Sequence, residues 1–148
     1  MSIPMRKHKM HRPRRTLTLV IAATFFLPLA GCGQADQSYA RTVARLRTIA
    51  AAYLDFVAAR GIGPSGEAQL REHLRHSIAF VASKEATGGD VAQVFASARD
   101  GQPFEINYGL SLGGSDSSAP QAIALESEGV SGERLAAFAN GKVATIAY

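Results

Sequence analysis

The hydrophobic pattern of this chain changes its period near Pro103, and this change restricts the fold more than any other feature. Before it, apolar residues recur every three or four positions, the repeat of an amphipathic helix. After it, apolar and polar residues alternate, as in a half-buried strand. Helices followed by strands are typical of the α+β class, in which helices cover one face of an antiparallel sheet. The sequence therefore predicts an α+β domain.

The segment 38–60 contains no Pro or Gly and is predicted to form one long helix. Asp36 or Ser38 is expected to cap its start, and Gly61 to follow its end. Its apolar stripe has spacings of three and four residues: Tyr39, Val43, Leu46, Ala50, Tyr53 and Val57. Three arginines are expected to mark the solvated sides: Arg41, Arg45 and Arg47. We interpret the aromatic residues of this helix, Tyr39, Tyr53 and Phe56, as part of the core. The alternative is that they form a stripe that binds another protein.

A shorter second helix is predicted from Ser65, its expected cap, to about Ser77. Its apolar side has a spacing of four residues: Leu70, Leu74 and Ile78. Residues 83–90 are predicted to form a loop. One helical turn follows, with Asp90 as its cap and two candidate core residues, Val94 and Phe95.

Four strands are predicted in the C-terminal part, over 103–109, 121–127, 134–139 and 142–148. Asn140 and Gly141 separate the last two and are a strong hairpin signal, because a type I′ turn needs a positive φ at both positions. A valine at position 140 is therefore expected to strain the turn. The predicted architecture is a long N-terminal helix and a short second helix packed on an antiparallel sheet of about four strands.

The N-terminal residues 1–31 have the composition of a bacterial export signal. Six basic and no acidic residues precede an apolar stretch over 17–30, which is short for a membrane span of about 20 residues. The next feature resembles the lipobox of bacterial lipoproteins: Leu29, Ala30, Gly31 and Cys32. This resemblance implies cleavage before Cys32 and attachment of a lipid anchor to its thiol. A buried structural cysteine is the alternative, although the chain has no second cysteine to pair with it.

The predicted organisation is a signal over 1–31, a lipidated cysteine with a short polar tether over 32–37, and one domain over 38–148. Without the signal, 10 basic residues face 12 acidic ones, a net charge of −2 rather than the +4 of the whole chain. The basic character belongs to the signal and does not indicate nucleic-acid binding. The domain is expected to be exported and to face the periplasm or the cell exterior. The residue after Cys32 is Gly33 rather than Asp, and in this respect the chain resembles lipoproteins that are sent to an outer membrane.

The order of elements and two turn motifs resemble the soluble domains of type II secretion pseudopilins. One motif, RDGQPF, is similar to the turn D-x-x-G-x-P-Y at the start of the pseudopilin sheet, and it begins with Arg99, Asp100 and Gly101. The other, FANGKVATI, is similar to F-x-D-G-x-V-x-x-I and contains Asn140 and Gly141, with Asn140 in place of Asp. The resemblance spans 38–148 and implies a pilin-like fold. Pilins keep their apolar segment as an assembly helix, whereas the lipobox implies its removal, so the likeness is not extended to filament assembly.

Few residues form patterns that carry chemistry. His73 and His76, three positions apart on a predicted helix with Glu72 between them, are weak candidates for metal ligands. A solvated helix face is the preferred interpretation, since no other His or Cys follows Cys32. Glu126 and Glu128 are expected to share one face of an exposed strand edge. No nucleophile elbow or phosphate-binding glycine motif is present, so neither catalytic residues nor a cofactor are predicted.

These observations predict a lipid-anchored envelope protein that binds another protein without catalysing a reaction, beside a secretion or pilus-like assembly apparatus. Its expected partners are the membrane, through the lipid, and an envelope protein, with no nucleic acid. A ligand-binding or hydrolytic envelope lipoprotein is the alternative. A concave pocket with converging polar groups would favour that alternative, and a flat sheet face over a filled core would favour the first interpretation.

Overall fold

The computed structural model describes residues 32–112 and 120–147. The helices are α1 (Cys32–Arg60), α2 (Glu67–Arg75), α3 (Ile78–Ala82), α4 (Lys84–Thr87) and α5 (Val91–Val94). The strands are β1 (Phe104–Ile106), β2 (Ala122–Glu126), β3 (Glu133–Phe138) and β4 (Val143–Ala147). They form one antiparallel sheet in the order β1-β2-β3-β4, which confirms the predicted α+β class. The predicted signal, with Leu29, Ala30 and Gly31, and part of the connection between β1 and β2 lie outside the described residues.

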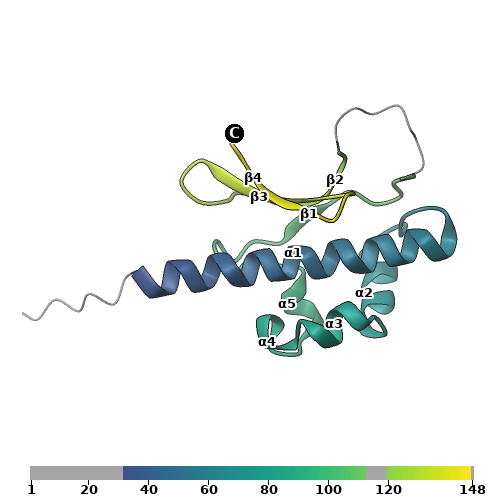
Figure 1. Cartoon of the computed structure of the whole chain (residues 1–148), viewed down its shortest axis with the longest axis horizontal. Helices are drawn as coiled ribbons and strands as arrows, with labels where there is room; N and C mark the ends of the chain where they lie inside the picture. The colour runs from purple at the N-terminus through teal and green to yellow at the C-terminus, as the bar shows by residue number, and fades with distance from the viewer. Residues whose placement is uncertain (1–31, 113–119, 148) are drawn as a thin grey trace, which may run out of the picture.

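Helix α1 forms the middle of three layers (Figure 1). It contacts β2, β3 and β4 on one side and the short helices α2 to α5 on the other. Its central residues are therefore buried around most of the helix: Leu46, Ile49, Ala50, Ala52, Tyr53 and Phe56. Helices were predicted to cover one face of the sheet. In the structure, α1 provides most of this cover. The short helices pack on the opposite side of α1 instead.

The ends of α1 differ from the prediction in one respect. The helix begins at Cys32 rather than near Ser38, so residues 33–37, predicted as a tether, are helical. Because this end extends beyond the sheet (Figure 1), Tyr39 is 46% exposed rather than part of the core. Gly61 follows the helix with a φ of 76°, as predicted for the residue after a helix end.

The second helix also departs from the expected pattern. Ser65 does not cap α2; its N–H and Oγ both donate to Gln69 Oε1. Leu70 and Leu74 are buried as predicted, but Ile78 is 87% exposed. The reason is local, because the chain turns after α2 and starts α3 at that point, with a new N-terminal cap at Ser77. A repeat of four residues does not continue across a break in the helix.

The segment between α3 and β1 contains fewer loop residues than predicted. Four residues of the predicted loop 83–90 form α4. The next turn, α5, is capped as expected, since Asp90 Oδ1 accepts a 2.8 Å hydrogen bond from the N–H of Ala92. Both candidate core residues of this turn, Val94 and Phe95, are buried.

The type I′ turn lies in the hairpin between β2 and β3 and not at the predicted position. In the hairpin between β2 and β3, Ser131 (φ 57°) and Gly132 (φ 78°) both have a positive φ, and Val130 and Glu133 exchange backbone hydrogen bonds across them. This is the geometry of a type I′ turn. Between β3 and β4, only Gly141 has a positive φ, of 77°. The predicted type I′ turn at Asn140 and Gly141 is therefore wrong.

The β3–β4 connection is instead a three-residue loop. The N–H of Gly141 donates to the carbonyl of Phe138, and the N–H of Phe138 donates to the carbonyl of Lys142. A tight turn followed by a left-handed glycine is the usual geometry for this length. Asn140 acts through its side chain, whose Oδ1 accepts a 3.0 Å hydrogen bond from the N–H of Lys142. A valine at position 140 removes this bond but introduces no left-handed strain.

We predict that Gly141→Ala destabilises the domain more than Asn140→Ala. A Cβ at position 141 meets no atom within 4 Å, so the cost is that of the left-handed backbone alone, about 1–2 kcal/mol. Asn140→Ala loses one exposed hydrogen bond and is expected to cost less than about 1 kcal/mol. Urea unfolding of both variants measures the difference, and equal costs would contradict the assigned turn.

Candidate functional site

A buried carboxylate joins the sheet to the turn that precedes it. Glu126, at the end of β2, is fully buried. Its Oε1 accepts a 2.6 Å hydrogen bond from Ser97 Oγ, and its Oε2 accepts 2.8 Å bonds from Arg99 Nη1 and from the N–H of Leu135. The predicted exposed edge is therefore wrong for Glu126, which pairs with the buried Phe104 and faces inward. Glu128 lies beyond β2 and is exposed.

The motif Arg99-Asp100-Gly101 forms the turn that enters β1. Gly101 has a φ of 75°, and its N–H donates to the carbonyl of Ser97. Asp100 Oδ1 accepts from the N–H of Gln102, and its Oδ2 accepts from the N–H of Gly129, both at 2.9 Å. The turn is thus joined to the connection between β2 and β3.

Thr42 extends this network to α1. Its Oγ1 donates to the carbonyl of Ser38, one turn earlier in the helix, at 3.0 Å. The same atom accepts a 2.9 Å hydrogen bond from the N–H of Ala98. Because Thr42 is fully buried, this contact holds the turn against the N-terminal half of α1. Helix, turn and sheet therefore meet at one polar cluster, which we call the Glu126 cluster (Thr42, Ser97, Arg99 and Glu126).

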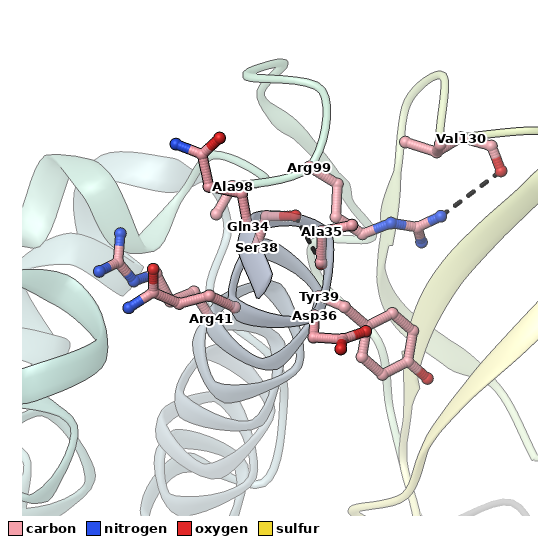
Figure 2. Close-up of a pocket in the computed structure, with 10 residues that line it drawn as sticks. Gln34, Ala35, Asp36, Ser38, Tyr39, Arg41, Ala98, Arg99 and Val130 are labelled. Carbon is pink, nitrogen blue, oxygen red and sulfur yellow. Dashed lines mark hydrogen bonds between the residues drawn. The ribbon is translucent and has the colours of Figure 1, made fainter. Parts of the chain in front are cut away.

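A groove with a volume of about 710 Å³ lies beside this cluster (Figure 2). The first two turns of α1 and Arg41 line it together with Ala98, Arg99 and Val130. Arg99, already bound to Glu126, places its guanidinium carbon 5.6 Å from the centre of the Tyr39 ring. A guanidinium over an aromatic face at this distance is attractive, so one side of the groove combines an aromatic surface with a fixed cation.

A second arginine near the groove is buried without a carboxylate. Arg45 is only 9% exposed, although the sequence predicted a solvated side chain. Its Nη1 donates to the carbonyl of Ala96 at 3.0 Å, and its Nη2 to Gln93 Oε1 at 3.1 Å. Its Nε is buried and has no hydrogen-bond partner among the residues that the structure describes. Burial, and secondarily the charge of Arg41, lower the pKa of Arg45.

The two histidines bind different carboxylates. His73 Nε2 lies 2.9 Å from Asp55 Oδ2 on α1, and its ring meets the Phe56 ring edge-on at 5.3 Å. His76 Nε2 lies 3.3 Å from Glu72 Oε1. The pKa of Glu72 is lowered by its hydrogen bond to Arg75 and then by that to His76. Within 32–112 and 120–147, no three His, Cys, Asp or Glu side chains gather as a group that could hold a metal ion.

At the other end of α1, a buried tyrosine holds the loop after β1. Tyr53 Oη accepts a 2.9 Å hydrogen bond from the N–H of Leu110. Burial raises the pKa of Tyr53, and this hydrogen bond opposes the rise. A Cβ on Gly63 would collide with the Tyr53 hydroxyl, so this position requires glycine for close approach. These contacts close the core rather than form a reactive site.

Comparison of the chain with protein-family models, with curated proteins and with solved structures finds no match. The resemblances to lipoproteins and to pseudopilins stay predictions that rest on the motifs. Of the helices in the described residues, none is both long and apolar enough to cross a membrane. Sequence reasoning identified Arg99 and Asp100 as turn residues but missed the burial of Glu126 and Arg45, because spacing alone does not show which layer covers a side chain.

We predict that Glu126→Ala destabilises the domain by about 3–5 kcal/mol. The substitution leaves the Arg99 guanidinium, the Ser97 hydroxyl and the Leu135 N–H without their acceptor in a buried site. Glu128→Ala, at an exposed position two residues away, is the matched control and should stay within about 0.5 kcal/mol of the wild type. Guanidinium unfolding of both proteins tests this; similar stabilities would show that the cluster contributes little.

Proposed function

We propose that this chain is a lipid-anchored, non-catalytic protein-interaction module of a bacterial cell envelope. Cys32 carries the lipid in this proposal, and the domain faces the periplasm or the cell exterior. The position of Cys32 as the first residue of α1 supports this arrangement. In this arrangement the lipid is attached directly to α1, the central helix of the domain, which has 29 residues and is about 44 Å long.

The observation that carries the interaction role is the outer face of the sheet. Leu135 and Ala137 point into the core, so their neighbours on β3 point the other way. Strand register then places partly buried apolar side chains on this outer face, Leu125, Phe138 and Ile146, around the exposed Ala144 and the fully buried Ala136. The same register places Arg134 and Glu105 on this face, where they form an ion pair at 3.1 Å. In Figure 1, α1 lies against the opposite face, and no described helix covers this one. A face that combines apolar side chains with one ion pair has the mixed composition of a surface that contacts another protein.

The two edges of the sheet differ in a way that supports the same role. On the β1 edge, the N–H of Phe104 donates to the carbonyl of Phe95, and Ala96 forms a bridge with Pro103. That edge is therefore partly closed. The β4 edge contains no charged residue from 143 to 147, and β4 pairs only with β3 in the described sheet. Uncharged edges are suited to contact with another chain.

The strongest catalytic alternative is a hydrolase built on Ser97 and Glu126. The 2.6 Å contact between them has the geometry of a nucleophile and its base. However, Ser97 is 2% exposed and Glu126 is fully buried, so a substrate does not reach the hydroxyl. Arg99 and the N–H of Leu135 also occupy the second carboxylate oxygen. These contacts support a structural role for the pair.

The lipid anchor is tested by Cys32→Ser. We expect this variant either to leave the membrane fraction or to accumulate as an uncleaved precursor, because serine lacks the thiolate that is alkylated. Fractionation of cells, with mass spectrometry of the N-terminal peptide, measures both outcomes. A variant that stays anchored at its mature mass would contradict lipidation at this residue.

The interaction surface is tested by a photoreactive amino acid placed at Ile146 in living cells. We expect crosslinks to a small, constant set of envelope proteins, and we expect Ala144→Lys to abolish them because it places a charge on the outer face. The matched control is the same photoreactive residue at Ile78, which is 87% exposed and belongs to α3. Equal crosslinking from both positions, or none from Ile146, would contradict the proposed surface.

A further inference from the structure

We propose that Arg41 and Arg45 form a binding site for a phosphoryl group at the side of the groove beside α1. The two arginines lie one helical turn apart and therefore on the same side of α1. In Figure 2, the Arg41 side chain projects away from Tyr39, Asp36 and Arg99. The site is thus separate from the Glu126 cluster, whose carboxylate neutralises Arg99 alone.

The first argument is a charge without a partner. Arg45 is nine-tenths buried, yet its guanidinium meets only a carbonyl and a side-chain amide, and its Nε meets no partner among the described residues. Buried cations are normally compensated by an anion, because desolvation of an unpaired charge is costly. Arg41 adds a second positive charge beside it rather than a negative one. Together they leave a local excess of positive charge that an oxyanion would balance.

The second argument is access. Arg41 is exposed and lines the groove, and no carboxylate lies within ion-pair distance of it in the described part of the chain. Arg45 does not itself line the groove; it lies one helical turn beyond Arg41 and donates to the carbonyl of Ala96. Asp36 also lines the groove, but Figure 2 places it on the side of Tyr39. An entering anion therefore meets Arg41 first, and in this proposal it moves the Arg41 side chain toward Arg45, whose guanidinium is covered in the structure.

The chemistry of two guanidinium groups selects the ligand class. The exposed guanidinium of Arg41 presents a planar fork of donors that matches two oxygens of a phosphoryl group. Arg45 has both Nη atoms bound to Ala96 and Gln93, and its contribution is its positive charge and the second hydrogen of each Nη. Free phosphate has four oxygens, enough to reach both arginines, whereas a phospholipid headgroup is a diester with two unesterified oxygens, one for each arginine. The source is either a free phosphate or a phospholipid headgroup. Arg41 is nine residues after Cys32, about 14 Å along the helix, so the headgroup source rests on the proposed lipid anchor, whereas the free-phosphate source does not.

The test measures the thermal unfolding of the purified full-length protein in dodecyl maltoside, a detergent without phosphate. One arm adds inorganic phosphate against chloride at equal ionic strength, and the other adds dihexanoyl phosphatidylglycerol. We expect the Tm to rise with ligand concentration in at least one arm, because a ligand that binds only the folded state stabilises it. Acetate is the control for a simple carboxylate and is expected to give a smaller shift.

Two variants and one matched control assign the effect to the site. Arg41→Gln and Arg45→Met are expected to weaken the affinity by roughly tenfold or more, since each removes charge-assisted hydrogen bonds. Arg47→Gln, at an exposed arginine of the same helix that does not line the groove, is expected to bind like the wild type. Arg41 is exposed, so its variant keeps the test valid if Arg45→Met does not fold.

The outcomes separate the two sources and the two proposals. A shift with inorganic phosphate supports the site whatever the result of the Cys32→Ser fractionation. A shift with phosphatidylglycerol alone supports the site and assigns it to a lipid headgroup. No ligand-dependent shift in either arm, or equal shifts in the wild type and in Arg41→Gln, overturns the proposal and leaves Arg45 as a bridge between α1 and Ala96.

Discussion

The contact between Glu126 and its three donors is the interaction on which the rest of this structure depends. A carboxylate inside a small domain is stable only if every oxygen is satisfied, and here Ser97, Arg99 and the N–H of Leu135 satisfy both. These donors come from the turn before β1 and from β3. The same turn is joined to α1, because the N–H of Ala98 donates a hydrogen bond to Thr42 Oγ1. One buried charge therefore sets the position of the sheet, the turn and the helix relative to one another, and it places Arg99 at the groove.

The central position of α1 explains several features that a two-layer fold would not produce. A helix covered on one side keeps its other side polar, but α1 is covered by the sheet and by α2 to α5. Arg45 lies on the side of the short helices and donates to Gln93 and to the carbonyl of Ala96. The N-terminal end of the helix extends beyond both layers, which leaves Tyr39 at the surface (Figure 1). The groove forms where this end meets the turn.

Two kinds of surface follow from this arrangement, and they support different contacts. The outer face of the sheet combines apolar side chains with the Arg134–Glu105 ion pair and lies next to an uncharged edge strand, which suits a protein partner. The groove is lined by Arg41, and Arg45 lies one helical turn further along α1. Neither arginine has a carboxylate partner in the described residues, which suits an oxyanion. The groove begins within two turns of Cys32. If the lipid is attached there, the groove is close to the membrane surface and the sheet face remains available to another protein.

The sequence by itself determined what depends on neighbours along the chain. The long helix, the α5 cap at Asp90 and the positions of the four strands along the chain follow from local periodicity and from turn chemistry. The tertiary structure decided what depends on distant residues. Glu126 resembles any exposed acid of a strand until Arg99 and Ser97 are brought to it, and Arg45 resembles a solvated helix residue until α5 covers it. Burial and charge pairing are properties of layers that meet in space, whereas a sequence pattern describes only one element at a time.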